Sequence, residues 1–521
     1  MINKIFEDID EKNQKRFIIE FIFGILFSVV IYSTFMTQQL TNTYDGMWRQ
    51  TYFISGNWEA SLGRWLLPII DTLHFGLHLD PMTSLMTLST FVIGFILILD
   101  LFEVKNLFIA LVSMSVFLSS TLVSIILSYR FTSFSYGLAF LFAVMAVYVP
   151  VKMNSFTIKI LLSALLICFF MALYQAFLAV YGLLILFYII FLILKGDNDF
   201  KKILSFIILT LECSIPGIII YAFSLAVSLK NRHIALSSYH GADSSGTTET
   251  LANLPKSMLN AYSLFFNYFF NPDKFNFRLN ALQDLKILWL MPVIFLFILI
   301  ITGIHVFKEN KKDRRMFIIY CIIVLLLPIA CNAALVIAPN ADFSLQTTVG
   351  PAIFFSLSIL LLDNESIKIK KPVSVIIGCI SMILLYGSIL QLQIDQNAML
   401  EGRKASEVMA LDILDDLKDQ GFYGSTLFFV GNPADNELFI VSPNYYRANP
   451  YAKIGSFALV RDCMRLSYQS FYYNYLHTPL NVSDKMYEDL AYSDEVKSMP
   501  SYPNAGYIKP LSDVVVVKLN H

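Results

Sequence analysis

Charged residues are scarce in this chain. Asp, Glu, Lys and Arg make up only 15% of its 521 residues, whereas soluble globular proteins contain about 25%. Hydrophobic residues reach 56%, and the mean hydropathy is +0.62. This composition excludes an ordinary soluble domain, because most of the chain lacks side chains suited to water. The net charge of −1 provides no field that would attract nucleic acid, so none is expected as a partner.

Paired cysteines and nucleotide-binding motifs are also missing. Five of the six cysteines lie in apolar runs, and no pair has the spacing of a disulfide or a metal site. We interpret them as small buried hydrophobic side chains. The sequence contains no Walker loop, no dinucleotide-binding fingerprint and no GxSxG elbow. These absences argue against an ATP-driven pump and against a serine hydrolase.

Long apolar runs are abundant, and each is close to the length of about 20 residues that crosses a bilayer. They predict an all-α polytopic membrane protein with about eleven transmembrane helices. The first run follows a polar start and has no cleavage site, so we expect it to remain as a membrane helix. The predicted spans lie near 17–38, 82–103, 107–127, 133–151, 158–174, 176–194, 203–227, 286–306, 316–338, 348–362 and 373–392.

Basic residues indicate the orientation of these spans, because cytoplasmic loops are enriched in Lys and Arg. The basic clusters fall in alternate loops, which predicts a cytoplasmic N-terminus and, with an odd number of spans, an extracytoplasmic C-terminus. The clusters lie at 4–16, 105, 152–159, 195–202, 308–315 and 368–371.

Three outer segments are too long to be simple connectors. Residues 1–392 are predicted to form the transmembrane domain, with long outer loops at 39–81 and 228–285. Residues 393–521 are predicted to form a small extracytoplasmic α/β domain. The signals are a helical pattern at 402–420 that stops at Gly421, and strand patterns at Ser425–Val430 and Val514–Leu519. Residues 251–270 predict an amphipathic helix that lies in the interface or packs on the bundle.

The first outer loop is dense in polar and aromatic residues. Asp45 follows the first span closely, and Arg49 would share a helix face with it. A carboxylate there can take a proton from an attacking hydroxyl, and a guanidinium can hold a phosphate with two hydrogen bonds. A surface salt bridge beside an aromatic belt is the alternative.

Two further arginines are candidates for binding a phosphate. Arg64 lies in the apolar stretch 63–70, which is too short to span and predicts an interfacial or re-entrant helix kinked at Pro68. Arg64 would then meet a lipid phosphate at headgroup depth, or simply extend to the interface. Arg130 breaks the charge rule at the outer end of the third span. It predicts either phosphate binding or an internal ion pair.

Other polar groups have weaker signals. Tyr174 and Gln175 at an outer turn could bind a sugar hydroxyl, or could serve the turn itself. His74 and His78, with Asp71 nearby, have a spacing that could bind a divalent metal. Their leucine-rich surroundings favour plain interfacial histidines, so no cofactor and no metal site are predicted.

The order of several short motifs resembles the Gtr type II glucosyltransferases. This family decorates bacterial surface polysaccharides and belongs to the GT-C superfamily. The motifs are individually short, and their layout covers most of the chain. They are Tyr44-Asp45, Gly63-Arg64-Trp65, Leu173-Tyr174-Gln175-Ala176-Phe177, Gln393-Ile394-Asp395-Gln396-Asn397 with Arg403, and Phe428-Phe429-Val430-Gly431.

The resemblance implies a GT-C-like fold and transfer of one sugar, often glucose, from a polyprenyl-phosphate carrier, with inversion. By the same resemblance the base is Asp45. The family often has two adjacent acids, whereas Gly46 follows Asp45 here, so Glu59 or Asp71 would have to supply the second. Arg49, Arg64 and Arg130 would stabilise the leaving phosphate.

The implied location is a bacterial plasma membrane, with lipid as a neighbour. The acceptor would be a surface glycan of the O-antigen, teichoic acid or capsule type. A transporter or flippase for lipid-linked glycans is an alternative, but the predicted spans contain few charged residues. A polysaccharide polymerase is a second alternative, and it would make long chains instead of single-sugar side chains.

Overall fold

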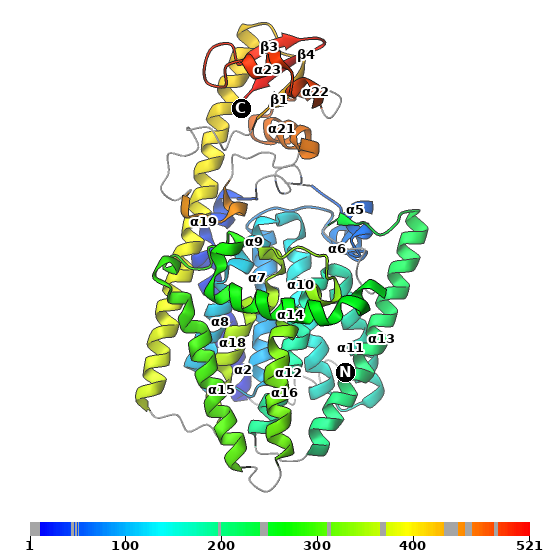
Figure 1. Cartoon of the computed structure of the whole chain (residues 1–521), viewed down its shortest axis with the longest axis vertical. Coiled ribbons are helices and arrows are strands. Elements are labelled where there is room, and N and C mark those ends of the chain that lie inside the picture. The colour runs from blue at the N-terminus through cyan, green and yellow to red at the C-terminus, as the bar shows by residue number, and fades with distance from the viewer. Residues whose placement is uncertain are drawn as a thin grey trace.

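The computed structural model is a bundle of long helices with a small β-sheet beyond one end (Figure 1). It describes residues 11–42, 46, 49, 52–195, 200–239, 248–309, 314–364, 371–431, 446–453, 461–483 and 488–520. The short helices α5 (Asn57–Ser61) and α6 (Leu67–Leu73) lie at the same end as the sheet (Figure 1). We call this the site end.

Each predicted span coincides with helix. The helices are α2 (Glu11–Ile31), α3 (Ser33–Gln38), α7 (Met82–Leu101), α8 (Leu107–Leu118), α9 (Thr121–Ser128), α10 (Arg130–Lys152), α11 (Phe156–Leu173), α12 (Leu178–Leu194), α13 (Phe200–Arg232), α15 (Leu290–Glu309), α16 (Arg315–Cys331), α17 (Ala333–Ile337), α18 (Val349–Leu360) and α19 (Lys371–Asp419).

Seven helices of the described chain are long and apolar enough to cross a membrane, and α8 with α9 makes an eighth if the bent pair counts as one span. The helix of the first predicted span is not among them, because α2 carries the charged residues Lys15, Arg16 and Glu20 in its first half. The helices α16 and α18 have only 17 and 12 residues. The protein is therefore a helical membrane protein with about seven clear spans, and eleven crossings stay a prediction.

Two further segments singled out in the sequence also form helices. The predicted kink at Pro68 is wrong: Pro68 is the second residue of α6, where its missing N–H has no helical partner to lose. The amphipathic segment forms α14 (Thr248–Phe270). It packs on α16 and α17, as the hydrogen bond from the Tyr262 hydroxyl to the Leu325 carbonyl shows.

The last span does not end at the membrane. α19 continues to Asp419 as one 49-residue helix, so the helix predicted at 402–420 is its extension. Gly421, with φ +73, stops it as expected. Because the predicted boundary at 392 lies inside α19, the division into two domains stays a prediction.

The small sheet contains both predicted strands. Its order is β2 (Asn481–Val482), β1 (Thr426–Val430), β4 (Val514–Lys518) and β3 (Ile508–Leu511). β1 is parallel to β2 and β4, and β3 is antiparallel to β4. The helices α21 (Arg461–Leu476), α22 (Glu488–Ala491) and α23 (Asp494–Ser498) accompany it.

Tyrosines fasten this sheet region to α19. The Tyr502 hydroxyl donates to Asp412 at 2.8 Å, and the Tyr507 hydroxyl donates to Asp416 at 2.7 Å. Both acids belong to the extension of α19.

Side chains from the middle of α19 form hydrogen bonds with the backbone at a break in the first span. The break falls at Tyr32, between α2 and α3. The side-chain amides of Gln393 and Gln396 donate to the Ile31 carbonyl at 2.9 and 2.8 Å, and Gln396 Oε1 accepts from the Phe35 N–H. These bonds replace the backbone partners that a continuous helix would supply.

A buried carboxylate on α19 joins several remote segments. Asp395 is wholly buried. Its Oδ1 accepts from Gln391 Nε2 at 3.0 Å and from the Asn449 backbone N–H at 2.9 Å. Its Oδ2 accepts from Asn449 Nδ2 at 2.8 Å and from the Tyr451 hydroxyl at 2.7 Å. The Tyr451 hydroxyl also lies 2.7 Å from the Ser124 hydroxyl of α9.

We expect Asp395→Asn to lower the free energy of unfolding by about 1–3 kcal/mol, because one acceptor becomes an NH₂ group that faces other donors. The measurement is thermal unfolding of the detergent-solubilised protein. The control is Asp415→Asn, since the Asp415 side chain is 74% exposed. Equal melting temperatures for both variants and the unmodified protein would contradict the role of Asp395.

Candidate active site

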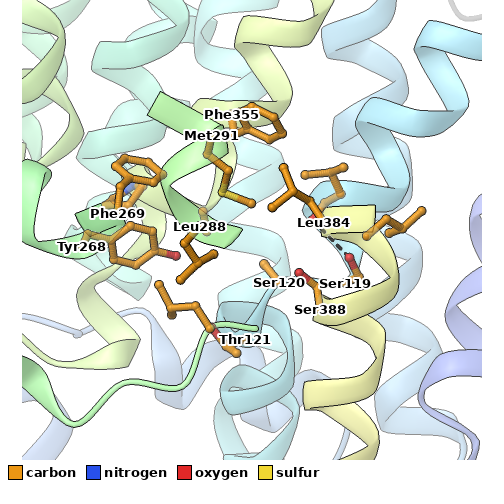
Figure 2. A pocket seen from close by; sticks show the side chains of 15 residues that line it. Ser119, Ser120, Thr121, Tyr268, Phe269, Leu288, Met291, Phe355, Leu384 and Ser388 are labelled. Carbon is orange, nitrogen blue, oxygen red and sulfur yellow. Dashed lines mark hydrogen bonds between the residues drawn. The ribbon is translucent and has the colours of Figure 1, made fainter. Parts of the chain in front are cut away.

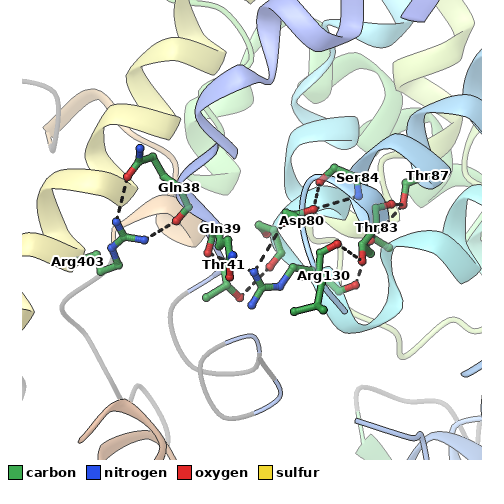
Figure 3. A network of polar contacts seen from close by, with 12 residues as sticks. Gln38, Gln39, Thr41, Asp80, Thr83, Ser84, Thr87, Arg130 and Arg403 are labelled. Carbon is green, nitrogen blue, oxygen red and sulfur yellow. Dashed lines mark hydrogen bonds and ion pairs between the residues drawn. The ribbon is translucent and has the colours of Figure 1, made fainter. Parts of the chain in front are cut away.

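Two arginines hold the end of the first span. Arg130 is the first residue of α10, and Arg403 lies on α19. Arg130 Nη1 donates to the Gln39 carbonyl at 3.4 Å, and Arg403 donates to the Gln38 carbonyl. Both contacts appear in Figure 3. The last carbonyls of a helix attract cations, so these side chains fix the point at which the chain leaves α3.

Arg130 forms the internal ion pair that was one of its two predicted roles. Its Nη1 lies 3.7 Å from Asp80 Oδ2, and both side chains are buried. Asp80 Oδ1 accepts from the backbone N–H of Ser84 at 3.0 Å and from its hydroxyl at 2.6 Å (Figure 3). Burial raises the pKa of Asp80, while the charge of Arg130 and the bonds from Ser84 oppose that rise.

Arg49 pairs with Glu59. Its Nη2 lies 3.4 Å from Glu59 Oε1, and both residues are buried. The guanidinium carbon also lies 4.7 and 4.6 Å from the ring centres of Phe53 and Phe131. Glu59 Oε2 accepts from the Gly56 N–H at 2.8 Å, which fixes the start of α5. Arg49 thus links parts of the first loop through Glu59 and Phe53, and ties the loop to α10 through the cation–π contact with Phe131.

Arg64 meets aromatic groups and is partly exposed. Its Nη1 donates to the Tyr136 hydroxyl at 3.1 Å, and its guanidinium carbon lies 4.7 Å from the centre of the Tyr174 ring. The Tyr136 and Tyr174 rings are stacked at 4.4 Å. The predicted residues Arg64 and Tyr174 are therefore in direct contact.

Gln175 positions the loop that carries Arg64. Its Nε2 donates to the Leu62 carbonyl at 3.1 Å and to the Tyr221 hydroxyl at 2.9 Å. Gly63 has φ +83, and a Cβ there would overlap the Gln175 amide. Glycine is therefore required just before Arg64. The contacts of Gln175 match the turn-supporting alternative for this residue.

Asp71 and the two histidines lie in the second half of α6 and in the link from α6 to α7. Asp71 is wholly buried, and its Oδ2 accepts from the Ser55 N–H at 2.8 Å. His74 Nε2 lies 3.6 Å from Asp71 Oδ1, and the His74 and His78 rings are 4.9 Å apart. His78 Nε2 contacts the Phe53 carbonyl at 2.9 Å, and burial lowers the pKa of His78. The described chain contains no group of three or more His, Cys, Asp or Glu side chains arranged for a metal.

Asp45 itself lies outside the described residues, but the chain before it is anchored. The Asn42 N–H and the Thr41 hydroxyl donate to the Ser128 carbonyl at 3.0 and 3.2 Å. Ser128 ends α9, two residues before Arg130. The loop predicted to carry the base therefore begins beside the Arg130–Asp80 pair.

The sequence-based prediction missed Asp80, Tyr136 and the placement of Arg403 against α3. Only Asp80 had a readable signal. A buried arginine at the end of a membrane helix needs a counter-charge, and Asp80 is the acid directly before the second predicted span. The contacts of Tyr136 and Arg403 join residues 72 and 365 positions apart, and no spacing rule reveals them.

Comparison with known proteins identifies the family of the chain. The family model for the glucosyl transferase GtrII matches residues 35–362, which include the first loop, Asp80, Arg130 and the Tyr174–Gln175 turn. No curated protein and no solved structure matches. The family match covers well over half of the chain and confirms the predicted resemblance. The protein therefore belongs to the GtrII glucosyl transferase family.

Proposed function

We propose that the protein transfers one glucose unit from a polyprenyl-phosphate carrier to a surface glycan on the extracytoplasmic face of a bacterial plasma membrane. The glycan is of the O-antigen, teichoic acid or capsule type. One observation carries this proposal. Arg64, Arg130 and the anchored start of the Asp45 loop gather at one end of a membrane-spanning bundle.

The proposed reaction is a single displacement with inversion. The acceptor hydroxyl oxygen attacks the anomeric carbon of the donor sugar, and the bond from that carbon to the phosphate oxygen breaks. The lipid phosphate leaves with the bonding electrons. The Asp45 carboxylate takes the proton of the attacking hydroxyl.

Arg64 is the arginine best placed to bind the phosphate. Arg49 and Arg130 are each buried and each within 4 Å of a buried carboxylate. Arg64 is partly exposed, and its contacts with two tyrosines orient the guanidinium. A phosphate can approach a partly exposed side chain, and the planar guanidinium suits two parallel hydrogen bonds to phosphate oxygens.

We expect Asp45→Asn to abolish glucosyl transfer, because the amide cannot accept the proton, while expression and donor binding remain. The measurement is transfer from polyprenyl-phosphate glucose in a reconstituted assay. The control is Asp494→Asn, a matched change at a fully exposed acid of α23. Activity in Asp45→Asn would refute the base assignment.

Arg64→Ala should raise KM for the lipid donor by about 10-fold or more, because a charge-assisted hydrogen bond is worth about 1.5–3 kcal/mol. Arg64→Lys should recover part of the loss. The control is Arg314→Ala, an exposed arginine before α16 at the opposite end of the bundle. Steady-state kinetics at varied donor concentration give the answer, and an unchanged KM removes Arg64 from the phosphate site.

Arg130→Ala tests a second phosphate contact. We expect it to lower stability, because it leaves the Asp80 carboxylate buried without its counter-charge, and to raise KM for the donor. In Arg130→Ala/Asp80→Ala the stability should recover while the raised KM persists. Thermal unfolding and donor kinetics on both variants separate the two roles. A normal KM in the double variant would restrict Arg130 to the ion pair.

A further inference from the structure

A cavity lies where the third membrane helix bends. The helices α8 and α9 meet at an angle of 47°. A small, partly open cavity lies beside this bend (Figure 2). Its other walls come from the end of α14, the start of α15, and the helices α18 and α19. None of its lining residues belongs to the site described above.

The cavity is apolar at one end and carries hydroxyl groups at the other (Figure 2). Met291, Leu384 and Phe355 line the apolar end, and Ser388 and Thr121 line the hydroxyl end. Ser388 lies one turn after Leu384 on α19, which runs toward the site end (Figure 1). The hydroxyl end of the cavity therefore faces the site end.

Two buried hydroxyl groups of the cavity indicate that it binds a ligand. Thr121 is 2% exposed, and neither its Oγ1 nor the buried Oγ of Ser120 has a hydrogen-bond partner in the described chain. A buried hydroxyl without a partner is unfavourable. These groups can donate to oxygen atoms of a headgroup or of its water, at the level where a lipid changes from chain to headgroup.

Two of the helices that line the cavity also have apolar outer surfaces. The flanking helices α15 and α19 present exposed apolar side chains, including Leu296, Ile383 and Tyr386.

The helix α9 connects the cavity to the site. It runs from Thr121 at the cavity to Ser128, whose carbonyl holds the start of the Asp45 loop. Its seven residue steps correspond to roughly 11 Å at 1.5 Å per residue. A lipid whose chain lies in the cavity thus extends its phosphate and sugar toward Arg130.

We propose that this cavity binds the polyprenyl chain of the donor, beginning a short distance from the phosphate. The inference rests on the lipid-linked donor of the proposed function. It adds a chain-length dependence: a donor with one isoprene unit ends before the cavity, whereas a donor with eleven units fills it.

The test narrows the cavity and compares two donors. Ala352 lines the cavity and is 7% exposed. Ala352→Leu should raise KM for the eleven-unit glucose donor by about tenfold, since it displaces buried CH₂ groups. The KM for the one-unit donor should change less than twofold. Met291→Trp is the second variant. Met291 also lines the cavity and is only partly buried, so the larger side chain can be accommodated with less disturbance of the fold.

The control is Ala226→Leu, the same change at an exposed position of α13 away from the cavity. Equal effects on both donors in the two cavity variants would overturn the proposal, and so would no effect on either donor.

Photo-crosslinking keeps this test independent of the proposed reaction. The probes are polyprenyl phosphate and phosphatidylglycerol, each with a diazirine in the chain. Labelling of α18 and α19 by the polyprenyl probe, lost in Ala352→Leu, supports the chain site even if no transfer occurs. In that case only the proposed function fails. Labelling by phosphatidylglycerol alone overturns the inference.

Discussion

The buried carboxylate of Asp395 is the constraint on which the site end depends. A carboxylate inside a protein is unfavourable unless hydrogen bonds compensate it, and four N–H or O–H groups surround this one. They bring α19, the segment 446–453 and α9 together. Asn449 adds two bonds to the Arg278 backbone, so a fourth segment joins. Because α9 leads directly to Arg130, the position of the site follows from this network.

The same helix controls the other side of the site. Gln393 and Gln396 stabilise the break between α2 and α3, and Arg403 holds the last turn of α3. The loop predicted to carry the base begins only a few residues later. A polar stretch of α19 beyond its predicted membrane span thus positions both the end of the first span and the segment 446–453. The motif at 393–397 thus lies against the end of the first span, about 360 positions away in sequence.

The buried arginines show how charge is kept at the site end. Arg49 and Arg130 each have an acid within 4 Å, and each pair is close to neutral as a unit. For Asp80 the cost of burial outweighs the help of Arg130, as its raised pKa shows. Such pairs are costly to break and hold loops in one arrangement. Catalysis by electrostatic stabilisation needs charges that are fixed before the substrate arrives.

Local patterns predicted the helices well and their breaks poorly. Apolar runs located the helix at each span, and short runs rich in valine and phenylalanine located β1 and β4. The break at Tyr32 contains no proline or glycine, and its lost hydrogen bonds are replaced by glutamines about 360 positions away. Pro68 was given the wrong role, because a proline early in a helix starts it and one in the middle kinks it. In the site, the sequence singled out Arg64 and Tyr174 separately, and their contact joins segments far apart in the chain. The pairing of Asp80 with Arg130 likewise appeared only in the structure.

The bend between α8 and α9 has a local cause and two consequences. Ser119 and Ser120 lie at the bend, and the Ser119 hydroxyl bonds to the Val116 carbonyl within its own helix. Serine hydroxyls compete in this way with the backbone ladder. A straight helix would continue along the axis of α8, so that α9 would not lie where it now lines the cavity. It would also carry Ser128 away from Asn42. The short run Ser119–Thr121 therefore lies between the cavity and the helix that anchors the first loop. In the proposed function, the lipid chain and the reacting headgroup of the donor would lie along this one helix.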